Sequence, residues 1–558
     1  MIDTPATMLF EKHRSTLEGA LRAIRERAYW SAYAELPGSR AYGENAKSEG
    51  EAAFKALLHA EFSLDQPSSG QTVGEERSPY GFPLGVRYPK IDLDRTIAAA
   101  QAALRSWREV GVRERVGALL EGLARLNARS FEIGFAAMHT TGQGAMMAFQ
   151  AAGPNAQDRG LEALAYAYEE MSRIPERVVW EKPQGKNLPI RLEKRYRIVP
   201  RGVALVIGCS TFPTWNAYPG LFASLVSGNA VIVKPHPGAV LPLALTVKVL
   251  RDVARELGFD PNIVQLAADE ASAPITEDIA LRPEIAIIDY TGSSTFGDRL
   301  EREARHALVY TEKAGVNSVI LDSTDDFEGM MRNIAFSLSL YSGQMCTAPQ
   351  NIFVPREGIK VAGKLVSFDD VVAALAGAVT SLLQDDARAV EILGALQNEA
   401  TAARLADAEK LGKIILPSRA VSDVRYPHAR IHTPLLLQVD AGNGASEREQ
   451  FGPISFVVRT KNTHESIARA AHAARERGAI SGAIYSVDRG ILDAACAAAA
   501  DAGIPLSCNL FGNAYVNQTA AFSDFHVSGL NPAGNAVLTD AAFVASRFRV
   551  ASSRESII

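Results

Sequence analysis

Cysteine is scarce in this chain, and the few cysteines stand far apart. The 558 residues include four, at positions 209, 346, 496 and 508, with no Cys-x-x-Cys pair and no Cys/His spacing suited to zinc. This pattern excludes a disulfide framework and predicts a chain of the reducing cytoplasm without a bound metal. A cysteine in such a chain can be present for its reactivity.

Long apolar runs and an excess of positive charge are also missing. No stretch of about 18 uncharged apolar residues occurs, which argues against a membrane span. The first residues, MIDTPATMLFEKHRS, have no basic flank before an apolar core, so we expect no secretion signal. With 58 basic and 63 acidic residues the net charge is −5, and no basic patch predicts binding to nucleic acid.

The length, with 47% hydrophobic and 22% charged residues, predicts two or more globular domains. Apolar spacing in the first part of the chain predicts helices, interrupted by an irregular arm over 36–80 that is rich in Pro, Gly and charge. Alternating residues around a turn at 184–187 predict a β-hairpin over 178–201. The predicted helices of this part cover residues 11–32, 92–110, 116–127 and 157–172.

Two α/β patterns follow the hairpin. Short apolar strands alternate with helices between residues 203 and 288, which predicts a parallel sheet with crossover helices. A second such pattern runs from 318 to about 510. The remainder, 511–558, is mixed, and its region 537–548 is predicted to close against a neighbouring element. The predicted strands are 203–207, 230–233, 263–266 and 285–288, and the helices are 215–227, 241–257, 324–340, 370–383, 387–408, 464–477 and 488–502.

One cysteine stands in a conspicuous context, YSGQMCT at residues 341–347. A cysteine after a Ser-Gly-Gln turn would be exposed by the bend, so Cys346 is a candidate nucleophile. The alternative is a small buried apolar residue, the commoner role of an isolated cysteine, and these seven residues do not separate the two.

A glutamate and a small-residue turn precede this cysteine. Glu312, in YTEKAG at 310–315, lies 34 positions before Cys346 and, taken alone, is better explained as a solvated carboxylate paired with Lys313. The turn YTGSSTFG at 290–297 follows a strand and opens a helix, where backbone N–H groups can approach a phosphate. It is not a GxGxxG, so the usual dinucleotide-binding fingerprint is absent.

Further segments lie on either side of these. STFP at 210–213 is followed by GNAVIVKP at 228–235, which places Lys234 at the carboxyl end of a predicted strand. Parallel sheets bind ligands at that edge, although a surface lysine beside a strand would give the same pattern. EQFGP at 449–453 adds an acidic residue before an aromatic turn.

Taken in order, these segments resemble the aldehyde dehydrogenase superfamily, from about residue 201 to 457. The resemblance implies an α/β fold with a Rossmann-type cofactor domain, an α/β catalytic domain and a β-hairpin for oligomerisation. It implies NADP or NAD as cofactor, a small-molecule aldehyde as substrate and a homo-oligomer. The implied domains are 1–177 with 202–313 for the cofactor, 314–510 for catalysis, and 178–201 with 511–558 for oligomerisation and bridging.

The resemblance also assigns roles to residues. Cys346 would form a thioester with the substrate, and Glu312 would activate the water that hydrolyses it. Lys234 would bind the adenosine-ribose hydroxyls, and the turn of Thr291, Gly292 and Ser293 would lie near the pyrophosphate. Glu449 would hold the nicotinamide ribose, with Phe451 beside that ring.

Two positions depart from the family pattern. Counted back from Lys234, Thr211 stands where most members carry the asparagine that serves as second oxyanion donor. Asn216 in the nearby Trp-Asn pair is the other candidate, and the choice between them stays open. Pro237 stands where many NAD-preferring members carry a glutamate that would repel a 2′-phosphate, which favours NADP or dual use.

More narrowly, the chain resembles the phenylacetate-degradation (PaaN) branch of the superfamily. The resemblance rests on the Tyr29-Trp30 pair and on AYGE at 41–44, STFPTWNAYPG at 210–220, SGQMCTAPQN at 342–351 and VNQTAAFSDFH at 516–526. AAFSDFH replaces the Phe-Gly-Gly and Lys-x-Ser-Gly elements of common members. The implied substrate is a CoA-linked semialdehyde, 3-oxo-5,6-dehydrosuberyl-CoA semialdehyde, with the ring-opening hydrolase on a separate protein.

Two alternatives to hydrolytic oxidation remain. In a CoA-acylating aldehyde dehydrogenase, coenzyme A and not water resolves the thioester; Glu312 argues against this, since acylating members commonly lack that base. A non-catalytic nucleotide-binding scaffold would keep the fold without turnover, which the intact Cys/Glu pair disfavours.

Overall fold

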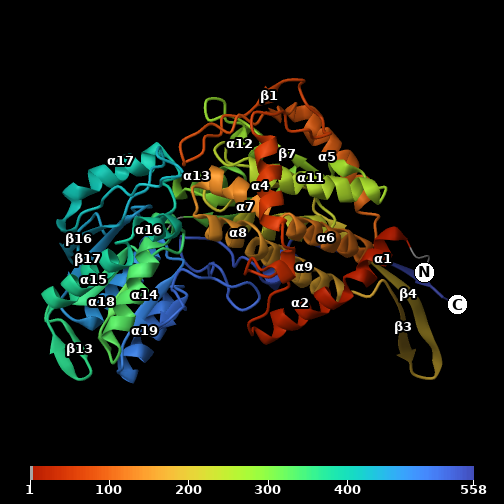
Figure 1. Cartoon of the computed structure of the whole chain (residues 1–558). Coiled ribbons are helices and arrows are strands. Elements are labelled where there is room, and N and C mark those ends of the chain that lie inside the picture. Colours follow the sequence, from red (N-terminus) through yellow and green to blue (C-terminus); the bar gives the residue numbers. More distant parts are fainter. Residues whose placement is uncertain (1–3, 314, 558) are drawn as a thin grey trace.

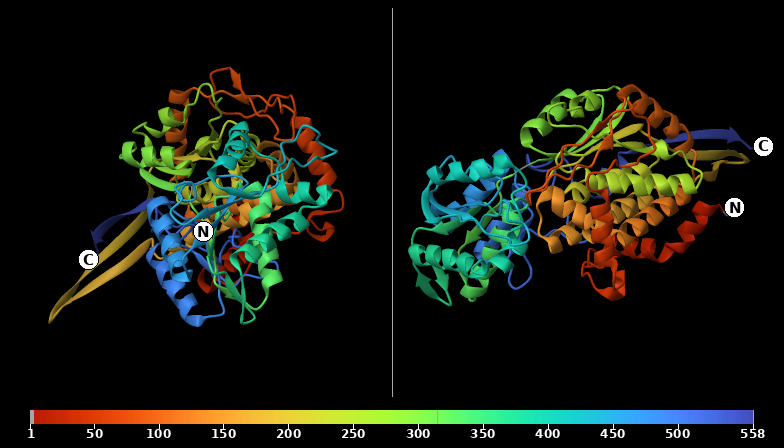
Figure 2. Two further views of the ribbon diagram at one scale, coloured as in Figure 1. Left: turned by 90° about the vertical axis from the view of Figure 1, so that its left-hand side faces the viewer. Right: turned by 45° about the horizontal axis from the view of Figure 1, so that its top comes forward.

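A computed structural model describes residues 4–313 and 315–557. Two α/β lobes lie side by side, and a β-hairpin extends from the larger lobe together with the C-terminal strand (Figure 1, Figure 2). This arrangement confirms the predicted fold, a Rossmann-type lobe, a second α/β lobe and a projecting hairpin. Within the described ranges no helix combines the length and the apolar character that crossing a bilayer requires.

Five parallel strands form the sheet of the larger lobe, in the order β7-β6-β5-β8-β9. Strands β5 and β6 are buried along their whole length, so their side chains point alternately into helices on both faces. Helices α5, α12 and α13 cover one face, and α10 and α11 cover the other. The bounds are β5 (Val203–Ile207), β6 (Ala230–Lys234), β7 (Val264–Leu266), β8 (Ile285–Gly292), β9 (Leu308–Lys313), α5 (Leu93–Trp107), α10 (Pro213–Val226), α11 (Leu241–Glu256), α12 (Thr276–Ala280) and α13 (Ser294–Glu303).

A helical layer from the first part of the chain packs behind α10. Two of its helices, α7 and α8, escaped the sequence analysis because α7 is buried on nearly all sides and has no amphipathic period. The predicted irregular arm contains α4, where Gly50 lets the helix approach Phe131: a Cβ there would lie 2.5 Å from that side chain. The bounds are α1 (Pro5–Lys12), α2 (Arg14–Glu26), α3 (Ser39–Tyr42), α4 (Ala46–Leu57), α6 (Val112–Ala128), α7 (Ser130–Thr141), α8 (Ala145–Ala152) and α9 (Pro154–Ser172), with the short strands β1 (Thr72–Val73) and β2 (Tyr88–Pro89).

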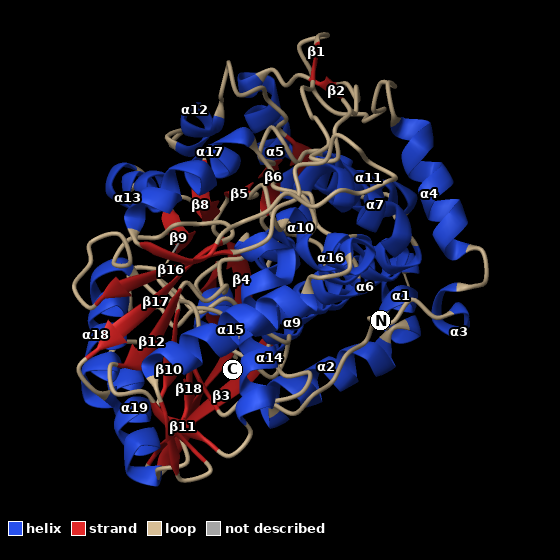
Figure 3. Ribbon diagram, turned by 60° about the vertical axis from the view of Figure 1, so that its left-hand side comes forward, coloured by secondary structure: helices blue, strands red, loops and turns tan. Residues whose placement is uncertain are grey.

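Seven strands form the sheet of the smaller lobe, in the order β15-β16-β17-β12-β10-β18-β19 (Figure 3). All neighbours are parallel except β15 and β16. A small sheet of β11 (Ser323–Thr324), β13 (Ile359–Val361) and β14 (Lys364–Val366) lies at its margin. The bounds of the main elements are β10 (Ser318–Leu321), β12 (Asn351–Pro355), β15 (Lys413–Leu416), β16 (Leu435–Asp440), β17 (Ile454–Thr460), β18 (Gly482–Tyr485), β19 (Leu506–Cys508), α14 (Phe327–Ser339), α15 (Phe368–Leu382), α18 (Thr463–Arg477) and α19 (Arg489–Asp501).

The single helix predicted over 387–408 is wrong. The chain forms α16 (Asp386–Leu393) and α17 (Glu399–Ala408) with a break between them. Gly394 has a φ of 58°, and a Cβ at this position would lie 2.3 Å from the carbonyl oxygen of Gly142. The backbone therefore leaves the helix to pack against the other lobe, a tertiary contact that helical spacing does not reveal.

The predicted hairpin is formed by β3 (Arg177–Gln184) and β4 (Asn187–Pro200). The C-terminal strand β20 (Phe548–Ser556) pairs along the other edge of β4, which gives a three-stranded antiparallel sheet. Preceding it, α20 (Ala541–Ala545) packs on α9, so the last part of the chain closes on the larger lobe.

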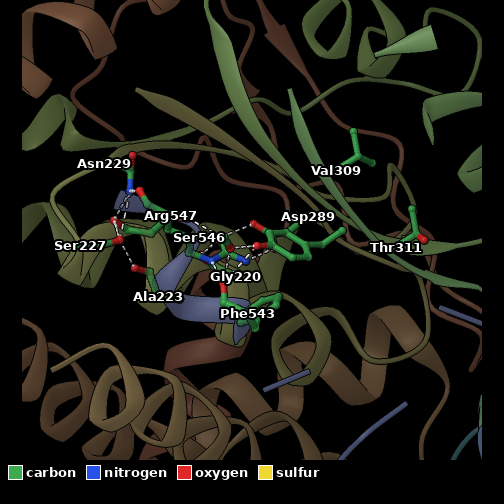
Figure 4. A network of polar contacts seen from close by, with 12 residues as sticks. Gly220, Ala223, Ser227, Asn229, Asp289, Val309, Thr311, Phe543, Ser546 and Arg547 are labelled. Atoms are coloured by element: carbon green, nitrogen blue, oxygen red, sulfur yellow. Dashed lines mark hydrogen bonds and ion pairs between the residues drawn. The ribbon is translucent and has the colours of Figure 1, made fainter. Parts of the chain in front are cut away.

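One buried ion pair fastens this C-terminal segment to the first sheet (Figure 4). The Arg547 guanidinium, which has no exposed surface, donates to both carboxylate oxygens of Asp289 on β8, at 2.8 and 2.5 Å. It also donates to Ser224 Oγ at 2.7 Å, and the Phe543 ring lies 4.1 Å from it. Every strong donor of this arginine is thus directed at a fixed acceptor or an aromatic face.

Replacing Arg547 by alanine is expected to lower the free energy of unfolding by about 3–5 kcal/mol, because Asp289 is left buried without its counter-charge. Urea titration measures the loss. Arg489→Ala, which removes an exposed pair with Asp493, is the matched control and should change stability by less than about 0.5 kcal/mol. Equal effects of the two substitutions would contradict a structural role for the buried pair.

Candidate active site

Cys346 follows a strained turn at the end of α14. In the turn Leu340–Gly343, Tyr341 and Ser342 have φ values of 52° and 49°, a left-handed conformation that non-glycine residues rarely adopt. Gly343 continues it at 64°, and a Cβ there would lie 2.4 Å from the carbonyl oxygen of Gly452. Such a backbone persists only where its surroundings hold it, and it presents Cys346 at the junction of the two lobes.

Side-chain hydrogen bonds hold this turn. Tyr341 Oη donates to the carbonyl of Thr141 at 2.5 Å, across the lobe junction. The other bonds reach the break between α16 and α17: Ser342 Oγ donates to Leu393 O at 3.1 Å, Gln344 Nε2 donates to Ala395 O at 3.1 Å, and Gln397 N donates to Gln344 Oε1 at 2.8 Å. The broken helix and the strained turn therefore support each other.

Asn317 fixes the far side of the cysteine. Its Nδ2 donates to the carbonyl of Cys346 at 2.7 Å, and its Oδ1 accepts from the backbone N–H of Ile480 at 2.8 Å. The sequence analysis did not single out this residue, because an asparagine at the start of a strand has many structural explanations.

The structure brings Glu312, at the end of β9, to Cys346. The Cys346 sulfur lies within 4.8 Å of a carboxylate oxygen of Glu312, and only 1% of the surface of Glu312 is exposed. Asn216 Nδ2 donates to its Oε2 at 2.7 Å and His526 Nε2 to its Oε1 at 2.9 Å. Lys313 points away, to Asp298 at 2.8 Å, which excludes the pairing of Glu312 with its neighbour.

Burial opposes the ionisation of both reacting groups, but their pKa values shift in opposite directions overall. It raises the pKa of Cys346 well above its usual range, and the charge of Glu312 adds to the effect. Burial also opposes ionisation of Glu312, but His526, Cys346 and Asn216 outweigh it and lower the pKa of that carboxyl. The resting site therefore holds a thiol beside a carboxylate that can accept its proton.

Asn216 and Thr211 occupy different surroundings. Asn216 lines the cavity that contains Cys346, whereas Thr211 is not among its described lining residues. The Thr211 carbonyl accepts a hydrogen bond from Gln143 Nε2 at 2.8 Å. The geometry thus turns the search for a second oxyanion donor from Thr211 to Asn216.

A cavity of about 690 Å³ leads to Cys346. Aromatic side chains form much of its wall, and amides such as Gln150 and Asn517 supply polar contacts. Its described lining includes the carboxylates of Glu35, Asp158 and Asp524 but no lysine or arginine. The aromatic members of the lining are Tyr29, Trp30, Phe212, Trp215, Phe336 and Tyr515.

Lys234, Thr291 and Gly292 lie at the carboxyl ends of parallel strands of the larger lobe, whereas Glu449 and Phe451 precede β17 of the smaller lobe. Ser293 caps α13 by accepting from the Phe296 N–H, and the turn before that helix is accessible to solvent, as a pyrophosphate site requires. Thr291 on β8 pairs with Glu312 on β9, which places this turn next to the base. Burial raises the pKa of the Glu449 carboxyl to about 7.

Lys234 ends β6 with its ammonium 2.7 Å from Asp269 Oδ1, and both side chains are nearly buried. Asp269 follows the end of β7, and no motif or spacing in the sequence marks it as a partner of Lys234. A carboxylate therefore stands beside the expected ribose site even though position 237 carries none. These residues fit a nicotinamide dinucleotide.

The comparisons with known proteins agree with this geometry. The sequence matches the aldehyde dehydrogenase family over residues 87–535. The chain belongs to the aldehyde dehydrogenase family. Its structure is similar to that of an NAD-dependent aldehyde dehydrogenase from Burkholderia multivorans, with 57% identity, a TM-score of 0.97, and coverage of 98% of this chain and 99% of that one.

Two further matches to this aldehyde dehydrogenase are more distant. An N-succinylglutamate 5-semialdehyde dehydrogenase of Burkholderia multivorans is 27% identical over 391 residues, 69% of this chain and 75% of that one. A Thermus thermophilus 1-pyrroline-5-carboxylate dehydrogenase shares the fold, with 17% identity, a TM-score of 0.74, and coverage of 95% and 99%. The protein is therefore an oxidoreductase that acts on aldehydes with NAD(P).

Asp269→Asn is expected to tighten the binding of NADP by about tenfold, or ~1.4 kcal/mol, and to leave NAD nearly unchanged, because a carboxylate beside Lys234 opposes a 2′-phosphate. Calorimetric titration of each dinucleotide measures both affinities. Glu270→Gln, one residue further and partly exposed, is the control for loss of charge alone. An unchanged ratio of the two affinities would remove Asp269 from cofactor selection.

Proposed function

We propose that this enzyme oxidises an aldehyde to the free carboxylic acid through a thioester on Cys346. Glu312 accepts the thiol proton, and the thiolate attacks the aldehyde carbon to form a thiohemiacetal. The nicotinamide of NAD(P), when bound, supplies the acceptor for the hydride that this carbon loses. Glu312 releases the thiol proton to solvent before hydrolysis, which is the net proton of the oxidation. Water then attacks the thioester, and Glu312 accepts the water proton. Collapse of the tetrahedral adduct releases the acid and expels the Cys346 thiolate, which takes this proton back.

One observation carries this proposal: the Cys346 sulfur lies within 4.8 Å of the Glu312 carboxylate, which Asn216 and His526 hold in place. Because the buried thiol ionises reluctantly, the reaction needs a base at this position. The Cys346 N–H and the Asn216 amide are the proposed oxyanion donors, each worth about 10²–10³ in rate.

The remaining residues are proposed to hold the cofactor. Lys234 binds the adenosine ribose, the turn of Thr291 to Ser293 binds the pyrophosphate, and Glu449 with Phe451 places the nicotinamide end. The proposal assigns 1–177 and 202–313 to the cofactor and 314–510 to catalysis. Two segments, 178–201 and 511–558, are assigned to bridging and to the assembly of the homo-oligomer.

The cavity constrains the substrate. Its aromatic wall without lysine or arginine fits an uncharged chain next to the aldehyde, and its carboxylates disfavour an anionic one. The carboxylates of an amino-acid semialdehyde such as N-succinylglutamate 5-semialdehyde would find no lysine or arginine among the described lining residues. We propose the CoA-linked semialdehyde of phenylacetate degradation as substrate, with its uncharged acyl chain in the cavity and its phosphates outside. Tyr29, Trp30 and residues of 516–526, which carry the resemblance to that branch, supply part of the wall.

A homo-oligomer is proposed on the three-stranded sheet. Apolar side chains on it are exposed, among them Leu188 at 88%, Val179 at 49% and Val550 at 44%. A second copy covering this sheet would remove that surface from water. Sedimentation at assay concentration tests the proposal, and a species with the mass of one chain would contradict it.

Product analysis separates hydrolysis from acyl transfer to coenzyme A. The enzyme is expected to form free acid and reduced cofactor in equal amounts without added coenzyme A, and Cys346→Ala to reduce this to background. Cys496→Ala, at an exposed cysteine, is the control and should keep full rate. A requirement for coenzyme A would establish the acylating alternative, and reduced-cofactor formation by Cys346→Ala would refute the proposed nucleophile.

A panel of aldehydes tests the substrate. Uncharged aromatic and long-chain aldehydes are expected to give a kcat/KM at least about tenfold higher than carboxylate-bearing semialdehydes of similar length, because a buried carboxylate without a partner is costly. Preference for the carboxylated semialdehydes would contradict the assignment of the cavity.

A further inference from the structure

Glu312 is held by a residue that lies 214 positions away in the chain. His526 Nε2–H donates to Glu312 Oε1 at 2.9 Å, and both side chains are only 2% exposed. With Asn216 on Oε2, each carboxylate oxygen has a fixed donor. His526 also lines the substrate cavity, so this contact lies within the reacting site.

The loop that carries His526 is attached to the strand that carries Glu312. The Lys313 N–H donates to Ala533 O at 2.6 Å, and the Thr311 N–H donates to Asn535 Oδ1 at 2.9 Å. A Cβ at Gly534 would lie 2.8 Å from Thr311 O, so the loop can approach β9 only with glycine there. The loop thus runs alongside the end of β9 as an added edge.

The imidazole ring itself is also fixed. The Trp215 ring meets it edge to face, with centroids 4.7 Å apart at 82°, and the Leu538 N–H donates to the His526 carbonyl at 2.9 Å. The Arg159 guanidinium lies 4.9 Å from the Trp215 ring on its own part. A ring packed in this way has little freedom to turn its Nε2 away from Glu312.

We infer that His526 is a positioning residue that holds the Glu312 carboxylate beside Cys346 for both proton transfers of the reaction. This inference rests on the proposed function of Glu312 as the base. The segment AAFSDFH, which stands in place of the usual C-terminal elements of the family, then has a chemical purpose: it delivers a donor to the base.

The surroundings of Glu312 explain why a donor is needed. The titratable groups that face it are His526, Cys346 and Cys209, and Lys313 is directed elsewhere. Burial by itself raises the pKa of a carboxyl, and His526 is the largest influence that lowers the pKa of Glu312. Without His526, the pKa of Glu312 would be higher, and a protonated Glu312 cannot take a proton from the thiol or from water.

Two substitutions separate the hydrogen bond from the packing. His526→Phe keeps the ring against Trp215 but has no N–H, and His526→Gln keeps an N–H that can reach Oε1. In His526→Phe, hydrolysis of the Cys346 thioester is expected to slow about 10²-fold, measured by rapid quench and intact mass. The acid limb of the pH profile of this rate is expected to move to higher pH. In His526→Gln the rate of hydrolysis should stay within about tenfold of the wild-type rate.

Infrared difference spectra give a readout that needs no turnover. The C=O band of protonated Glu312 is identified by its loss in Glu312→Gln, which is necessary because burial raises the pKa of Glu76, Asp158 and Glu449 to about 7. In His526→Phe this band should persist to higher pH than in the wild type. The NAD(P) affinity of His526→Phe, measured by calorimetry, should equal that of the wild type, which shows that the fold is intact. If His526→Phe does not fold, His526→Asn takes its place, because its side chain is too short to reach Oε1.

Wild-type thioester hydrolysis together with an unmoved Glu312 band in the variant that lacks the donor would overturn the inference. Equal losses of hydrolysis rate in His526→Gln and His526→Phe would also overturn it, because lost packing alone gives that result. If the wild type forms no thioester with any aldehyde while the band moves as expected, the proposed function fails and the hold of His526 on Glu312 stands.

Discussion

The buried carboxylate of Glu312 is the constraint around which the two lobes are arranged. A group so nearly removed from solvent is stable as an anion only where donors surround it, and these come from two distant parts of the chain, α10 and the C-terminal loop. The cysteine turn, from a third part, brings the Cys346 sulfur beside it. β9 belongs to the sheet of the larger lobe, and Cys346 belongs to the smaller one. The contact between them makes the lobe junction the reacting site.

Backbone strain serves the same junction. Three consecutive left-handed residues before Cys346 cost conformational energy, and side chains of that turn recover it through bonds to Thr141 and to the broken helix at 393–397. The Arg547–Asp289 pair fastens the C-terminal segment to β8, and the same segment contributes His526. Fold closure and positioning of the base therefore depend on one stretch of chain.

Short-range patterns sufficed for much of the fold. A continuous apolar run predicts a buried strand such as Val203–Ile207, and apolar residues at helical spacing predict an amphipathic helix such as α18. The order of the short motifs predicted Cys346 and Glu312 as reacting residues. Patterns failed where tertiary contacts decide: α7, buried all round, and the break at Gly394, which exists because Gly142 is near. His526 and Asp269 could not be found by spacing, since only folding brings them to Glu312 and Lys234.

The most direct test of the account is the intact mass of Glu312→Gln mixed with aldehyde and NAD(P) at alkaline pH, where the thiol ionises without the base. The account predicts that a thioester accumulates on Cys346, located by peptide mapping, because the variant can form it but cannot activate water. Absence of an adduct together with steady release of acid, or an adduct on another residue, would contradict it.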